Sequence, residues 1–111
     1  MPGASPQIAE HSRTVRRLIA DYLQLWHAPA PSGGRRATLG REIHDALAYL
    51  DQHALAAGAS KAAVEDLLGP APGGIGADVW FYPSDMSSQT YEVAFEHGHL
   101  IRKGFITVRF N

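Results

Sequence analysis

The chain has 111 residues, of which 45% are hydrophobic and 19% are charged, a composition that suits one globular domain over residues 1–111. Its formal net charge of −1 argues against direct binding of nucleic acid, and the absence of Cys excludes disulfides and thiolate metal sites. No stretch approaches the ~20 apolar residues of a membrane span, and no basic segment followed by an apolar run opens the chain. We therefore expect a cytoplasmic protein without membrane contact.

Two long amphipathic helices are predicted first. The first spans about 6–27, with Pro6 at its first position and apolar residues at steps of three and four. The second spans about 38–57, where Thr38 can cap the start and Gly58 ends the helix. Because a loop of roughly ten residues joins them, the two helices can pack antiparallel as a hairpin.

A short third helix is predicted over residues 60–68. Ser60 is its N-cap, Gly69 stands just after its last turn, and Pro70 prevents continuation. The Pro- and Gly-rich residues 70–76 are interpreted as a linker within the domain.

The last third of the chain, about 78–110, is predicted to form a three-stranded antiparallel meander. In its first strand, Val79 and Phe81 are expected to face the helices, and Trp80 and Tyr82 to point to the opposite face. The reverse assignment, in which Trp80 and Tyr82 belong to the core, stays open because both faces are apolar.

The remaining strands have clearer boundaries. Pro83 is expected to end the first strand because it cannot donate to a ladder. Residues 90–96 alternate, with Tyr91, Val93 and Phe95 inward, and His97–Gly98 predicts a tight hairpin leading into a strand from His99. The fold class is therefore α+β: an N-terminal helical hairpin plus a short third helix packed on the meander.

No catalytic residue, metal site or cofactor is assigned from the sequence. His97 and His99 flank a glycine near Glu96, but no third ligand or HExxH motif accompanies them. A small His-dependent or metal-dependent hydrolase that uses these imidazoles with Lys103 stays open as an alternative.

Charge is distributed unevenly along the chain. Between Ala62 and Ile101 there is no Lys or Arg, whereas the acidic residues there are Glu65, Asp66, Asp78, Asp85, Glu92 and Glu96. A surface of one sign attracts a partner of the opposite sign. We expect these six acids to form a partner-binding surface, with Trp80, Tyr82 and Tyr91 as aromatic anchors. The alternative is an ordinary solvated face.

Residues 58–110 resemble the SmpA/OmlA (BamE-like) domain pattern. The matching stretches are Gly58–Ala59–Ser60, Val64–Glu65, Leu67–Leu68–Gly69 with Pro72, Trp80–Phe81–Tyr82, and Val93 through Gly98. The resemblance implies a helix followed by antiparallel strands and, as one alternative, a scaffold for assembly in the cell envelope.

By type, the chain is also similar to the immunity proteins of contact-dependent growth-inhibition and related polymorphic toxin systems. Those are small α+β proteins that bind and neutralise a cognate toxin domain, often a basic nuclease. This second resemblance implies a non-enzymatic protein-binding module whose partner is a basic toxin domain, and we take it as the leading hypothesis.

Overall fold

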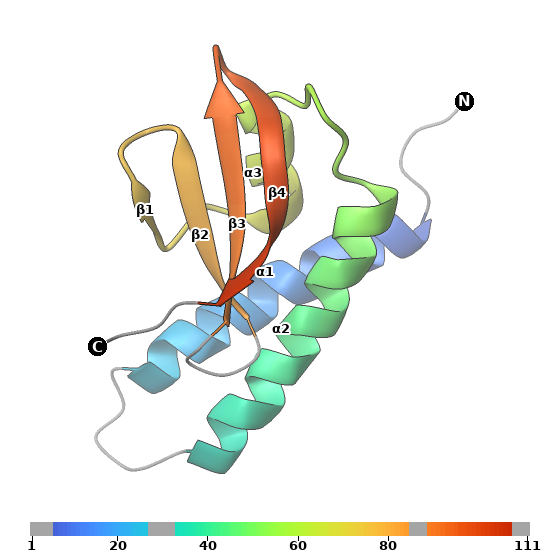
Figure 1. Cartoon of the computed structure of the whole chain (residues 1–111). Coiled ribbons are helices and arrows are strands. Elements are labelled where there is room, and N and C mark those ends of the chain that lie inside the picture. The colour runs from blue at the N-terminus through green and yellow to red at the C-terminus, as the bar shows by residue number, and fades with distance from the viewer. Residues whose placement is uncertain (1–5, 27–32, 85–88, 108–111) are drawn as a thin grey trace.

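The computed structural model describes residues 6–26, 33–84 and 89–107, and confirms the α+β class. In chain order the elements are α1 (Pro6–Trp26), α2 (Gly33–His53), α3 (Lys61–Leu68), β1 (Gly73–Ile75), β2 (Val79–Ser84), β3 (Gln89–Glu96) and β4 (His99–Thr107). The helical hairpin of α1 and α2 lies along one end of the sheet, and α3 lies against one of its faces (Figure 1). None of the helices described is long and apolar enough to cross a membrane.

The core lies between the helices and the inner face of the sheet. Each helix contributes its apolar stripe, because a helix buries residues three and four apart on one side. The buried residues form one cluster, which includes Val15, Leu18, Ile19, Ile43, Leu47, Leu50, Val64, Leu68, Tyr82, Tyr91, Val93, Phe95 and Leu100.

The bounds of α2 differ from the prediction at both ends. It begins at Gly33 instead of Thr38, since Gly lowers helix propensity without forbidding a helix. It ends at His53 instead of Ala57, where the Leu55 amide donates to the Leu50 carbonyl at 2.9 Å and the Leu55 side chain enters the core. The predicted end of α1 at His27 lies outside the described residues.

The start and end of α3 are as expected. The Ser60 hydroxyl accepts a hydrogen bond from the Ala63 amide at 3.1 Å, and Gly69 follows the helix with a φ of 83°. The preceding segment is tied to the sheet, because the Gly58 amide donates to the Leu100 carbonyl and the Leu100 amide to the Ala59 carbonyl, both at 2.8 Å. These bonds fix α3 relative to β4.

The sheet has four strands in the order β1-β2-β3-β4, all antiparallel, so the predicted three-stranded meander is one strand short. The missed strand, β1, lies in the stretch that was interpreted as a linker, because glycines are poor strand formers. Gly74 pairs with Trp80, and a Cβ there would lie 2.2 Å from the Val79 carbonyl oxygen. The close approach of the two backbones therefore requires glycine.

The face assignment of β2 was wrong. Trp80 and Tyr82 point toward the helices, where Tyr82 is fully buried, and Val79 and Phe81 lie on the partly exposed opposite face. The register explains this, because Tyr82 pairs with Tyr91 and paired residues share a face. The inward positions predicted for β3 are confirmed.

Pro83 lies within β2, although the sequence predicted that it would end the strand. It pairs with Thr90 of β3, whereas β1 reaches only as far as Phe81. On the β1 side of Pro83 no described strand follows. A missing amide donor therefore leaves no ladder hydrogen bond unmade on that side. The hairpin prediction is confirmed, with positive φ values of 54° at His97 and 81° at Gly98.

Candidate protein-binding surface

Two of the three expected aromatic anchors are core residues. The hydroxyl of Tyr82 donates to the Gly69 carbonyl oxygen at 2.8 Å, and that of Tyr91 donates to Asp51 Oδ1 at 2.6 Å. Both side chains have zero relative exposure. A partner at the surface cannot contact these rings in this structure, and their polar ends instead join the sheet to the helices.

Burial also determines how these tyrosines titrate. Desolvation raises the pKa of Tyr91 well above its usual range, and the hydrogen bond to Asp51 raises it further. Burial likewise raises the pKa of Tyr82, with a second contribution from the negative charge of Glu65.

Two of the predicted partner-binding acids are paired within the molecule. Asp78 Oδ1 lies 2.7 Å from Lys61 Nζ, and Glu92 Oε1 lies 3.0 Å from Arg102 Nε. Only 16% of the Glu92 side chain is exposed. Both acids are thus partly neutralised by cations that lie just outside the acidic stretch of the sequence.

The other predicted acids are placed differently. Glu96 is exposed at the β3–β4 hairpin, 3.7 Å from His97 Nε2. Asp85 lies outside the described residues. Glu65 and Asp66 are exposed on α3, and their carboxylates make no hydrogen bond or ion pair with any residue that the structure describes.

Trp80 is the predicted anchor that remains partly accessible. Its ring packs on Phe95 with centroids 4.6 Å apart, and its Nε1 donates to the Ala77 carbonyl oxygen at 3.1 Å. On the other side, Trp80 borders a hollow of about 330 Å³ together with Glu65. The structure thus brings together one acid and one aromatic that are fifteen positions apart in the sequence.

A second hollow adjoins this one along α3. It is lined by Arg16, Ala62, Glu65, Asp66, Gly69 and Pro70. The Arg16 side chain runs past Gly69, and its Nε donates to the Ser12 carbonyl oxygen at 3.4 Å. A cation from α1 therefore borders the α3 acids on one side, whereas the lining of the Trp80 hollow contains no cation.

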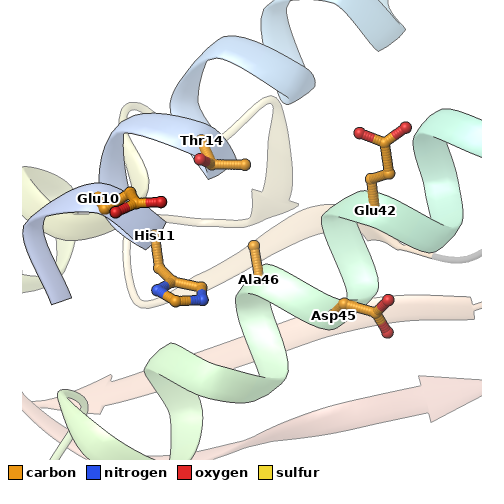
Figure 2. Close-up of a pocket in the computed structure, with 6 residues that line it drawn as sticks. All are labelled: Glu10, His11, Thr14, Glu42, Asp45 and Ala46. Atoms are coloured by element: carbon orange, nitrogen blue, oxygen red, sulfur yellow. The ribbon is translucent and has the colours of Figure 1, made fainter. Parts of the chain in front are cut away.

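Sequence reasoning missed a third hollow, which lies between α1 and α2. It measures about 270 Å³ and is lined by Glu10, His11, Thr14, Glu42, Asp45 and Ala46. Figure 2 shows the His11 imidazole in the gap between the helices, with Glu10 beside it on α1 and with Glu42 and Asp45 on α2, whose carboxylates point away from the ring. The sequence does show that the lining residues of each helix are three and four positions apart and so share a helix face. Finding the hollow also required knowing which faces of α1 and α2 meet.

The aromatic rings beside this third hollow are already engaged. His11 stacks on Tyr49 with centroids 3.9 Å apart, and the Tyr49 hydroxyl donates to Gln7 Oε1 at 2.9 Å. The hollow thus offers carboxylates but no free aromatic face. It provides a natural comparison for the α3 surface.

The histidines considered for catalysis do not converge in the described part of the chain. His99 Nδ1 lies 3.1 Å from the Gly58 carbonyl oxygen, whereas the His97 side chain is 89% exposed. No group of three His, Asp or Glu side chains suited to a metal ion occurs among residues 6–26, 33–84 and 89–107. His44 Nδ1 lies 3.2 Å from Ser84 Oγ, but Ser84 is buried, so this hydroxyl has no access to a substrate.

Comparison with known proteins adds no relative. No family model, no curated protein and no solved structure matches the chain. Its function is therefore inferred from its own surface.

Proposed function

We propose that this chain is a non-enzymatic protein-binding module, an immunity protein that acts in the cytoplasm by binding and blocking a basic toxin domain. One observation carries the proposal. Glu65 and Asp66 project from α3 without a partner among the described residues, and Glu65 borders a hollow together with the partly accessible Trp80. Exposed carboxylates beside a Trp are suited to a partner with a positive surface, because Trp is a frequent hot-spot residue.

Binding would proceed in two steps. The carboxylates of α3 attract a positively charged domain, which raises the rate of encounter at low salt. Contact then removes Glu65 and Trp80 from water, and this slows dissociation. If the toxin is a nuclease, the carboxylates occupy the positions that substrate phosphates would otherwise take.

The scaffold around these residues is rigid. The Ser60 cap, the Gly58–Leu100 backbone bond and the Tyr82–Gly69 hydrogen bond fix both ends of α3 on the sheet. A fixed helix loses little conformational entropy when it binds, so more of the contact energy appears as affinity.

The test uses the C-terminal domain of a large secreted toxin, which the immunity function predicts to be encoded beside this gene. Its association with the protein is followed by stopped-flow fluorescence at several salt concentrations. We expect the double variant Glu65→Lys/Asp66→Lys to associate about tenfold more slowly at low salt than the unchanged protein, with the difference shrinking as salt rises.

The matched control is Glu42→Lys/Asp45→Lys, which changes the net charge by the same amount at the hollow between α1 and α2. We expect it to slow association by less than about twofold. Equal slowing by both variants would assign the effect to net charge and remove α3 as the binding surface. The absence of a complex with the adjacent toxin domain would contradict the immunity function itself.

A further inference from the structure

The hollow bordered by Trp80 has an unusual lining. It lies where β1 and β2 meet the end of α3, and its walls come from Glu65, Pro70, Ala71, Gly73, Gly74, Gly76 and Trp80. Glu65 is the only charged residue in this set. The remaining surface is one indole ring, the small apolar residues Pro70 and Ala71, and the backbone of a glycine-rich segment.

We propose that this hollow is the receptor site for one cationic side chain of the partner, an arginine whose guanidinium binds the Glu65 carboxylate beside the Trp80 ring. This inference rests on the proposed function, because it assumes a protein partner, and it names the chemical group that the partner supplies. The chemistry is complementary: a guanidinium donates to a carboxylate and stacks on an aromatic ring.

The alternatives fit the lining less well. A glycine-rich segment can bind phosphate through its amides, but here the only charge is negative, and it would repel an anion. The volume of about 330 Å³ is near the lower end of ligand pockets, roughly 300–1,000 Å³. A single side chain fits that space better than an extended cofactor does.

The site is preorganised by contacts already in place. The Trp80 ring is held from behind by Phe95, and its Nε1 is held by the Ala77 carbonyl. The nearby cation Lys61 pairs with Asp78 at 2.7 Å, and Arg16, which lines the adjoining hollow with Glu65, donates through Nε to the Ser12 carbonyl oxygen. Both recognition groups are therefore available before the partner arrives.

A direct test uses N-acetyl-arginine methylamide as the probe and the full chain as the receptor. The readout is the indole Nε1–H resonance of Trp80 in a nitrogen–proton NMR spectrum. The chain has two Trp residues, so the variant Trp26→Phe identifies the signal. We expect a saturable shift of the Trp80 resonance with a dissociation constant in the millimolar range, which is typical of a single side chain.

Two controls isolate the contacts. N-acetyl-citrulline methylamide has nearly the same shape without the charge, and we expect it to leave the resonance in place. Glu65→Gln should weaken arginine binding about tenfold, equivalent to ~1.4 kcal/mol, whereas Asp66→Asn on the same helix should weaken it by less than about twofold. Because both variants replace exposed carboxylates, neither threatens the fold.

The outcomes separate the site from the function. No shift with arginine, an equal shift with citrulline, or equal losses from Glu65→Gln and Asp66→Asn would overturn the site, even if the toxin domain still binds. An arginine shift that depends on Glu65, together with a failure of the toxin domain to bind, would leave the site standing and refute the immunity function.

Discussion

The hydroxyl of Tyr91 is expected to be one of the larger single contributors to stability. It donates to Asp51 Oδ1 at 2.6 Å from a fully buried ring, and so joins β3 to the end of α2. A hydrogen bond to a charged group contributes roughly 1.5–3 kcal/mol. Asp51 Oδ1 also lies 3.2 Å from Lys103 Nζ, and the Asp51 side chain is partly exposed, so its charge keeps some compensation when the hydroxyl is removed. We therefore expect Tyr91→Phe to cost about 1.5–2 kcal/mol.

The measurement is urea unfolding of Tyr91→Phe at neutral pH, completed as a double-mutant cycle with Asp51→Ala. The Asp51 backbone carbonyl that accepts from Lys103 survives that substitution, so the cycle mainly reports the side-chain contact. Tyr49→Phe is the matched control, because its hydroxyl donates to Gln7 at the surface, and it should change stability by less than about 0.5 kcal/mol. A coupling energy below about 0.5 kcal/mol between positions 51 and 91 would refute the assigned contact.

Three further predictions follow from other contacts. Burial raises the pKa of Tyr82 and Tyr91, so above about pH 10 the folded state keeps protons that the unfolded state loses. The free energy of unfolding therefore falls with rising pH in this range, by ~1.4 kcal/mol per pH unit for each tyrosine. Urea midpoints on either side of pH ~10 should show a shallower decline when either tyrosine is Phe, and an unchanged slope would contradict this assignment. Ser60→Ala should destabilise the protein by about 1 kcal/mol through loss of the α3 cap, whereas Ser60→Thr should restore most of it in the same unfolding assay. Arg102→Ala should cost less than about 1 kcal/mol, because 59% of its side chain is exposed; a larger loss would show that the pair with Glu92 is more than a surface contact.

The sequence predicted the strands best where polar and apolar residues alternate. In β3, Tyr91, Val93 and Phe95 are separated by polar or small residues, so the buried face could be identified correctly. In β2, Val79 through Tyr82 are all good strand formers, and either face could serve as the core. In the structure the Tyr82 face is the buried one, and its hydroxyl donates to the Gly69 carbonyl oxygen at the end of α3, a contact that periodicity does not reveal.

Glycine accounts for two further errors, the start of α2 and the missed strand β1. Gly33 opens α2 and Gly73–Gly74 form most of β1, although both stretches have the composition of loops. Propensity is a weak guide when neighbouring elements supply the stabilisation, as α1 does for α2 and β2 does for β1. At Gly74 the strand pairing itself requires glycine, because a side chain would collide with the Val79 carbonyl oxygen.

The candidate site was predicted only in part, because burial and ion pairing depend on register. Of the predicted residues, Glu65 and Trp80 border one hollow, and Asp66 lies with Glu65 at the adjoining one. Tyr82 and Tyr91 belong to the core instead. No count of charges along the chain distinguishes an exposed carboxylate from one that a cation on the next strand neutralises.

One irregularity in the sheet determines which acids remain available. The register shifts between Ala94 and Phe95, so that Ile101 is an extra residue in β4 and Arg102 pairs with Ala94. Without that extra residue, Arg102 would pair with Val93 and point into the core. The bulge turns Arg102 to the outer face, where it neutralises Glu92, and turns Lys103 inward to Asp51. Glu92 is thereby compensated within the molecule. Among the described acids of the predicted surface, Glu65 and Asp66 on α3 and Glu96 at the hairpin have no Lys or Arg partner, and Glu65 borders the same hollow as Trp80.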